Sequence, residues 1–184
     1  SNWKFAIENY CESYHLPTIH PELNKVSSIN DHYHIQGLPN RFAGQGSRKY
    51  EQSRKGKKKF DTFRNWEKKS LKISEYIAIF PNVMIGLHID HFYVFWLEPI
   101  ATNITKEHMK MYYIGNKSAN GDELKELRKE NIKFWKNVML EDIIAIERMQ
   151  EGRNSPIYNG GNFSPIMDKP THQFHKWVSN ILTR

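Results

Sequence analysis

Two histidines, His15 and His20, stand with four residues between them, and Pro17 lies inside that interval. On an uninterrupted helix, five residues leave side chains about 140° apart, so the two imidazoles could not face one point. A proline inside a helix removes a hydrogen bond and ends or kinks the helix. We therefore expect a helix that ends after His15 and a chain that turns back, bringing His20 to the same metal ion. Glu12, three residues before His15, would lie on the same helical face.

Asp142 is the candidate for a third metal ligand. It lies in a helical segment whose repeating face is apolar, with Val138 before it and Ile146 after it. An unpaired carboxylate on such a face would cost several kcal/mol of free energy, so it requires a cation. Two imidazoles and one carboxylate leave coordination positions open, and they suit ferrous iron that must bind oxygen. The alternative is that Asp142 is exposed to solvent beside Glu141.

Two further histidine pairs are weaker candidates for a metal site. His88 and His91 are three residues apart, which would place their side chains on opposite faces of a strand, so an edge or turn position explains this pair better than a metal site does. His172 and His175 are one helical turn apart near the C-terminus. A solvated helical face explains this second pair better than a zinc site does.

The hydrophobic pattern predicts the elements that would position the candidate ligands. Helical spacing of apolar residues covers 3–15, 121–150 and 170–183, and weak strands are expected within 26–45. Strands rich in branched and aromatic residues are expected at 74–80, 83–89, 92–100 and 107–114. A block of strands followed by a long helix predicts one α+β domain over residues 1–184, with the helix lying against an antiparallel sheet.

Alternation along these strands does not decide which residues form the walls of a substrate pocket. The two alternatives are the set Met84, Gly86 and His88 and the set Val83, Ile85 and Leu87. On the next strand Phe92, Val94 and Trp96 share a side. Such an aromatic wall could accept an aromatic ring or, by cation–π attraction, a quaternary amine. The candidate pocket residues are Met84, His88, Phe92, Trp96 and, from the long helix, Val138.

Composition limits the other possibilities. The single cysteine, Cys11, excludes an internal disulfide and a cysteine-ligated iron–sulfur or zinc site built within this chain. No apolar run is long enough to span a membrane, and we expect a cytoplasmic protein. The formal charge of +7 is concentrated in 48–72, where eleven Lys and Arg face three acids. Nucleic-acid binding through this segment is a minor alternative, and an acidic redox partner competes with it.

A series of short motifs runs along most of the chain. It begins with Asn-Trp-Lys at 2–4 and Glu-Asn-Tyr at 8–10, and it includes the segment 12–21. It continues through Phe-Pro-Asn at 80–82, Asp-His at 90–91 and Glu-Asp at 141–142. In this order the motifs resemble the catalytic domain of Rieske-type ring-hydroxylating oxygenase large (alpha) subunits, and the resemblance extends to about Gly161. The resemblance implies a helix-grip fold, in which an antiparallel sheet curves around the long helix. It also implies Fe(2+) bound by His15, His20 and Asp142.

The same resemblance implies roles for two other residues and for partners outside this chain. Glu12 would bridge to a histidine of the Rieske cluster in a neighbouring subunit, and Asn9 would lie just outside the metal ligands. The [2Fe–2S] cluster would belong to a Rieske domain, either in a missing N-terminal part or in another subunit. A reductase or ferredoxin would supply electrons for the hydroxylation of a small organic substrate by O2. The full-length protein would form a homotrimer, and this chain alone would not sustain turnover.

Two alternatives to an oxygenase remain open from the sequence. One is a small-ligand-binding module of similar helix-grip shape without redox chemistry. The other is a nucleic-acid-binding domain that uses the basic segment 48–72.

Overall fold

The computed structural model describes residues 1–51, 58–63 and 72–183. Its helices are α1 (Trp3–Tyr10), α2 (Leu16–Ile19), α3 (Pro21–Val26), α4 (Gly115–Asn120), α5 (Lys125–Arg153) and α6 (Lys169–Leu182). Its strands are β1 (His32–Ile35), β2 (Phe42–Ser47), β3 (Ser74–Ile79), β4 (Val83–Leu87), β5 (His91–Ala101) and β6 (Ile104–Tyr113). Single 3₁₀ turns cover Ile29–Asp31 and Asp122–Leu124.

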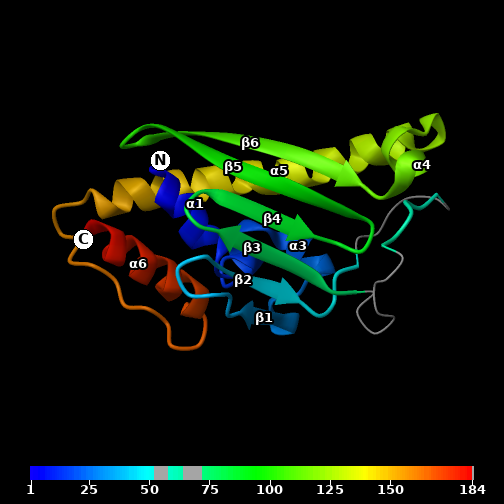
Figure 1. Cartoon of the computed structure of the whole chain (residues 1–184). Coiled ribbons are helices and arrows are strands. Elements are labelled where there is room, and N and C mark those ends of the chain that lie inside the picture. Colours follow the sequence, from blue (N-terminus) through cyan, green and yellow to red (C-terminus); the bar gives the residue numbers. More distant parts are fainter. Residues whose placement is uncertain (52–57, 64–71, 184) are drawn as a thin grey trace.

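The six strands form one antiparallel sheet in which each strand pairs with its neighbour in sequence, in the order β1-β2-β3-β4-β5-β6. Helices cover one face of this sheet, and the 29-residue α5 runs along the molecule behind β5 and β6 (Figure 1). The prediction of an α+β helix-grip fold, in which an antiparallel sheet packs around a long helix, is therefore confirmed. The short α1 contacts α5, α6, β3 and β5, so it lies between the long helix and the sheet.

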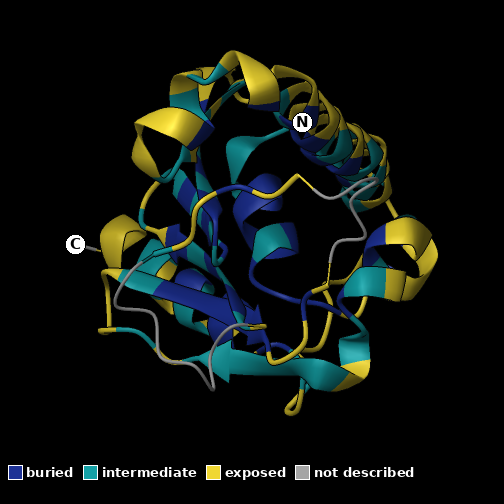
Figure 2. Ribbon diagram, turned by 90° about the vertical axis from the view of Figure 1, so that its right-hand side faces the viewer, coloured by how far each residue is buried: buried dark blue, intermediate teal, exposed yellow. Residues whose placement is uncertain are grey.

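Alternation along the strands sends one set of side chains into the core. Tyr76, Met84, Tyr93 and Phe95 are buried on the inner face, where they meet Trp135 of α5. Figure 2 shows this buried layer between the sheet and the helices, with the exposed residues of α5 on the outside. Burial of aromatic and branched side chains in this layer supplies the main stabilisation of the fold.

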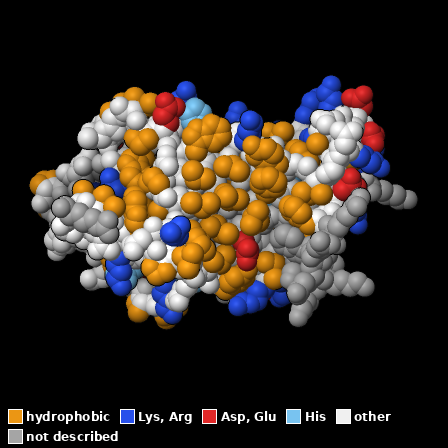
Figure 3. Space-filling view, viewed as in Figure 1, with side chains coloured by type: hydrophobic (Ala, Val, Ile, Leu, Met, Phe, Trp, Pro, Cys, Tyr) orange, Lys and Arg blue, Asp and Glu red, His pale blue; other side chains and the backbone are white. Residues whose placement is uncertain are grey.

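The opposite face of the sheet is also rich in apolar side chains (Figure 3). Phe92 stacks on Tyr112 at a ring-centroid distance of 4.7 Å, and Trp96 stacks on His108 at the same distance. Trp96 remains 37% exposed. Because both faces of the strands are apolar, hydrophobic alternation alone could not identify the inner face.

The N-terminal helix ends earlier than the sequence predicts. It was expected to continue to His15, but α1 ends at Tyr10, and Gln45 of β2 explains the difference. The side-chain amide of Gln45 donates to the carbonyl oxygen of Tyr10 at 3.3 Å and to that of Glu12 at 2.5 Å. These bonds satisfy carbonyl groups that a longer helix would have paired internally.

The prolines begin helices rather than ending one. Pro17 lies in the first turn of α2, and Pro21 is the first residue of α3. The first turn tolerates proline because its N–H groups have no partner within the helix.

The remaining boundaries lie close to those predicted, apart from the short helices α2, α3 and α4, which the sequence did not indicate. The two weak strands are β1 and β2, and α5 continues past Gln150 to Arg153. Among the described residues, no helix combines the length and apolarity that a membrane span requires. Most of the basic segment 48–72, with the nucleic-acid hypothesis attached to it, lies outside the described residues.

Candidate metal centre

The one-turn helix α2 places both candidate histidines. His15 is the residue before its first turn, and His20 is the residue after its last turn, where α3 begins. The main-chain N–H of Ile19 donates to the carbonyl of His15 at 2.8 Å, which closes this turn. The chain thus turns between the two imidazoles and presents both on one side, although it does so through the helical turn of α2, which contains Pro17, and not through a helix break at Pro17. The ring centroids are 5.1 Å apart.

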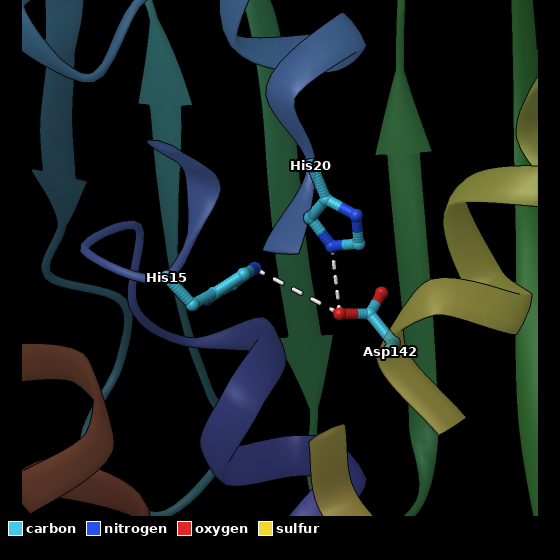
Figure 4. Close-up of side chains that lie close together, drawn as sticks. All are labelled: His15, His20 and Asp142. Atoms are coloured by element: carbon cyan, nitrogen blue, oxygen red, sulfur yellow. Dashed lines mark hydrogen bonds and ion pairs between the residues drawn. The ribbon is translucent and has the colours of Figure 1, made fainter. Parts of the chain in front are cut away.

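Asp142 of α5 completes the group. Its Oδ1 atom lies 2.8 Å from Nε2 of His20 and 3.8 Å from Nε2 of His15. One ligand atom from each of the three residues falls within 4.8 Å of the others. Figure 4 shows the two rings and the carboxylate pointing toward a common centre. The alternative in which Asp142 points into solvent is therefore excluded.

Each histidine is held by a second carboxylate through its other ring nitrogen. Nδ1 of His15 contacts Oε1 of Glu12, and the main-chain N–H of His15 donates to the same carboxylate at 3.3 Å. Nδ1 of His20 lies 2.7 Å from Oε2 of Glu141. A carboxylate on Nδ1 fixes the ring and leaves Nε2 as the free ligand atom, which is the usual arrangement around metal-binding histidines.

Asn9 lies beside the three candidate ligands. Its side-chain amide donates to Oδ1 of Asp142 at 2.6 Å, and the residue is buried near the end of α1. This bond fixes the orientation of the carboxylate. The role that the resemblance gives Asn9, just outside the metal ligands, stays a prediction.

The charges around the centre fit a cation. Burial alone lowers the pKa of His20, but the hydrogen bonds and negative charges of Asp142 and Glu141 outweigh it and raise this pKa. The pKa of Glu107 on β6 is raised to about 7 by burial and by the charge of Asp142. In both cases the negative charge of Asp142 contributes to the raised pKa. Donor atoms bound to one metal at about 2.0–2.2 Å lie roughly 3 Å apart, so small movements of these side chains would accommodate the ion.

A pocket, which we call the inner pocket, opens onto the three candidate ligands. Four aromatic side chains form much of its wall, and amide and imidazole groups supply its polar part. It is lined by Asn9, Tyr10, His15, Leu16, His20, Leu23, His32, Gln45, Tyr76, Tyr93, Trp135, Val138, Met139 and Asp142.

Comparison with known sequence families decides the relationship. Residues 1–184 match the catalytic domain of the ring-hydroxylating alpha subunit. The chain belongs to this family. The resemblance inferred from the sequence motifs is thereby confirmed, and with it the assignment to the catalytic domain of Rieske oxygenases.

This chain aligns with individual relatives over almost its full length, but it spans less than half the length of each relative named below. Choline monooxygenase of Spinacia oleracea is 26% identical over 99% of this chain and 38% of the relative. Putrescine 2-hydroxylase of Bordetella bronchiseptica is 27% identical over 98% of this chain and 44% of the relative. The crystal structure of the quaternary ammonium Rieske monooxygenase CntA with an inhibitor has a TM-score of 0.70 at 19% identity. The match covers 99% of this chain and 46% of the CntA chain, and it shows that the two share a fold.

Only one of the five residues predicted to form a substrate pocket lines the inner pocket. Val138 lines the inner pocket. Met84 and His88 are buried on the inner face of the sheet, but neither lines this pocket. The structure thus selects the set that contains Met84 and His88 as the inward one, and Val83, Ile85 and Leu87 lie on the other face.

The prediction that Phe92 and Trp96 line the pocket is wrong. In β5 the buried residues are His91, Tyr93, Phe95 and Leu97, whereas Phe92 and Trp96 lie on the outer face. Tyr93 takes the predicted place in the wall and lies over Gly86 of β4. A Cβ atom on Gly86 would be 2.2 Å from the ring of Tyr93, so the glycine makes this approach possible.

His88 and His91 both lie in the core, on either side of a turn, and a turn position is one of the explanations that the sequence favours over a metal site. Their rings stack at a centroid distance of 4.5 Å. Because β4 ends at Leu87 and β5 begins at His91, the two residues flank the turn and do not share a strand. Nδ1 of His91 contacts Oδ1 of Asp90 at 2.6 Å, and Nε2 accepts the indole N–H of Trp135 at 2.9 Å.

A second opening, the outer crevice, reaches the metal centre from the helical side of the domain. It has a volume of about 440 Å³. Its walls come from α1, α2, α5, α6 and the segment 158–168, and they include Glu8, Glu12, Tyr14, His15, Arg153, Tyr158, Phe163, Asp168 and His175. Because His15 and Asn9 border both openings, the candidate metal centre lies between the inner pocket and the outer crevice.

The sequence missed Glu141 and the aromatic wall. In the sequence Glu141 stands out only as the neighbour of Asp142, although a histidine ligand requires an acceptor for its second nitrogen. Tyr10, Tyr76 and Tyr93 line the inner pocket from three different elements. No local spacing connects residues so far apart in the chain.

Proposed function

We propose that His15, His20 and Asp142 hold one ferrous ion, and that this chain is the catalytic part of an oxygenase that hydroxylates a small organic substrate. One observation carries the proposal. Both imidazoles direct Nε2 at Oδ1 of Asp142, while a carboxylate occupies Nδ1 of each ring. Two histidines and one carboxylate with open positions are typical of non-haem iron that reacts with oxygen. Family membership supports the same chemistry.

The ion, when bound, supplies the site at which oxygen is activated beside the substrate. The residues of this chain position and insulate that site. Glu12 and Glu141 keep the two imidazoles in the tautomer that presents Nε2. Asn9 holds the carboxylate of Asp142 by its hydrogen bond. The inner pocket brings the substrate to the side of the ligands that faces the sheet.

Glu12 is the proposed link to an electron donor. It is buried, it contacts His15, and it lines the outer crevice. A donor domain docked in the crevice would therefore lie against a residue that touches a metal ligand. We expect this donor to be a Rieske [2Fe–2S] domain, of the same polypeptide or of a neighbouring subunit in a trimer, supplied by a reductase or ferredoxin.

A small organic cation is the substrate class that the inner pocket favours. Tyr10, Tyr76, Tyr93 and Trp135 present aromatic rings to it. Aromatic faces attract ammonium groups, most strongly where water is excluded. The relatives act on choline, putrescine and quaternary ammonium compounds according to their names, which points in the same direction.

Anaerobic titration with Fe(II) tests the metal assignment. The wild-type chain should bind one ion, and His15→Ala should bind none with comparable affinity. Equal stoichiometry in the two proteins would refute the assignment. Glu130→Ala, which changes an exposed residue of α5, is the matched control and should bind as the wild type does.

Binding of choline tests the substrate class. Choline should bind the wild type more tightly than 3,3-dimethylbutanol, its uncharged counterpart of the same shape. Tyr76→Leu should weaken choline by about tenfold, since it removes a ring from the wall. Trp96→Leu, on the outer face, should leave the affinity unchanged. Equal affinity for choline and the uncharged compound would eliminate the cation hypothesis.

A further inference from the structure

Two tyrosine hydroxyls in the inner pocket share a single hydrogen bond. The hydroxyl oxygens of Tyr10 on α1 and Tyr93 on β5 lie 3.3 Å apart, and both residues line the pocket. A phenol has one hydrogen to donate and can also accept a bond. Whichever of the two hydroxyls donates, the other keeps its own hydrogen. Within the described part of the chain neither hydroxyl has a further partner, so one O–H group of the pair lacks an acceptor.

Both phenols are neutral and shielded from water. Burial is the largest cause that raises the pKa of Tyr10 and of Tyr93 well above the usual value of 10, so both keep their hydrogens at neutral pH. Tyr93 is fully buried. An O–H group that is removed from water without an acceptor costs free energy, so this position favours a ligand that brings an acceptor atom.

The other polar ring groups of the pocket wall outside the metal ligands are already paired. Both ring nitrogens of His32 have partners, at 2.8 and 3.1 Å. The hydroxyl of Tyr76 bonds to two serines, among them Ser74 at 3.3 Å. The indole N–H of Trp135 donates to Nε2 of His91. A substrate oxygen would therefore find its donor at the tyrosine pair and not at these three rings.

Tyr10 is the member of the pair next to the metal centre. The negative charge of Asp142 contributes to its raised pKa, whereas that of Tyr93 is raised by burial and by neighbouring phenols. One divalent ion would not neutralise the three carboxylates around it, which are Glu12, Glu141 and Asp142. Because this field repels an anion, a neutral oxygen is favoured over a carboxylate beside Tyr10.

The geometry points to a hydroxyl-binding subsite in the inner pocket, in which Tyr10 donates its hydrogen to a neutral oxygen of the substrate. The substrate is then an ammonium compound that also carries a hydroxyl group, an amino alcohol. This inference rests on the proposed function, whose substrate class it narrows. Tyr93 is a positioning residue, because its hydrogen bond to Tyr10 fixes that hydroxyl and polarises it as a donor.

The test compares choline with propyltrimethylammonium, in which a methyl group replaces the hydroxyl. By calorimetric titration, choline should bind the wild-type chain about tenfold more tightly, because the propyl compound leaves the O–H group of Tyr10 without an acceptor. Tyr10→Phe should remove this preference. Tyr93→Phe should reduce it to about threefold, since Tyr10 keeps its hydrogen but loses the polarising bond. Tyr112→Phe removes a hydroxyl on the outer face, where Tyr112 is 39% exposed, and should keep the full preference.

The ratio of the two affinities separates recognition of the hydroxyl from a merely structural role. If Tyr10→Phe weakens both compounds equally, its hydroxyl only supports the pocket and the proposal fails. Equal affinity of the wild type for both compounds would also overturn it, because water would then serve the hydrogen of Tyr10. Tighter binding of glycine betaine than of choline would overturn the choice of a neutral oxygen.

A third compound, 3,3-dimethylbutanol, separates this inference from the proposed function. A wild type that prefers choline over propyltrimethylammonium, but binds 3,3-dimethylbutanol as tightly as choline, would support the hydroxyl subsite and defeat the cation hypothesis. A wild type that prefers both ammonium compounds over 3,3-dimethylbutanol, without distinguishing between them, would support the cation hypothesis and defeat the subsite. Iron is titrated separately, since neither tyrosine is among the three converging ligands.

Discussion

Nε2 of His20 lies 2.8 Å from Oδ1 of Asp142, a residue 122 positions later in the chain. This contact links the short turn after α1 to the middle of the long helix α5. It therefore fixes the relative position of the two segments that carry all three candidate ligands. A divalent ion bound between the two side chains would replace this direct contact, because a histidine ligand binds metal through an unprotonated nitrogen.

Replacing Asp142 should abolish the metal site. Asp142→Ala removes the atom on which both imidazoles converge, so the chain should no longer bind stoichiometric Fe(II) in an anaerobic titration. Glu147→Ala changes an exposed acid on the same helix and should leave one ion bound. Retention of stoichiometric, tight iron by Asp142→Ala would show that the ligands lie elsewhere.

Glu141→Gln should weaken iron binding without removing the site. The glutamine can still contact Nδ1 of His20, but it carries no charge to strengthen the imidazole as a ligand. Loss of such a supporting carboxylate typically costs 10–100-fold in metal affinity, and we expect about tenfold because Glu141 is 43% exposed. The dissociation constant for Fe(II) measures the effect. An unchanged constant would mean that Glu141 does not support the ligand.

The three candidate ligands could be predicted from residue types. Pro17 indicated that the chain must turn between His15 and His20, and a carboxylate on an apolar helical face indicated a cation at Asp142. The early end of α1 was not predictable locally, because the bond donor that ends it is Gln45, on a strand more than thirty residues away. The turn is therefore a tertiary feature that proline only permits.

The inner pocket was harder to predict, and the physical reason lies in β5. Its residues from Phe92 to Leu97 are apolar on both sides of the strand, so alternation gives two equivalent solutions. Register with β4, in which Tyr93 pairs with Gly86, decides between them. The missing information was the pairing of strands, which depends on the whole sheet.

The ion pair between Glu8 and Arg153 should make stability depend on pH. Burial raises the pKa of Glu8, but its hydrogen bonds to His175 and Arg153 outweigh this effect and lower the pKa below its usual value of 4.5. Because the folded state favours the ionised form, the stabilisation is present above about pH 4.5 and is lost as the pH falls through the lowered pKa.

Glu8→Gln should therefore reduce the free energy of unfolding by about 2 kcal/mol at pH 7, a value kept low because Arg153 is 34% exposed. The difference between variant and wild type should shrink below pH 4. Chemical denaturation at several pH values measures it. A difference that stays constant from pH 7 to pH 3 would rule out the ionised pair as its cause.

Two glycine substitutions should act in opposite directions. At Gly86 a new Cβ atom would lie 2.2 Å from the ring of Tyr93 in the inner pocket, whereas at Gly152 in α5 nothing lies within 4 Å. Gly86→Ala should destabilise the domain by about 1–3 kcal/mol through overpacking, and it should weaken choline binding by displacing Tyr93. Gly152→Ala should stabilise it by up to about 1 kcal/mol, because alanine favours the helix. Denaturant unfolding measures both, and a stable Gly86→Ala with unchanged choline affinity would contradict the close packing of Tyr93 over β4.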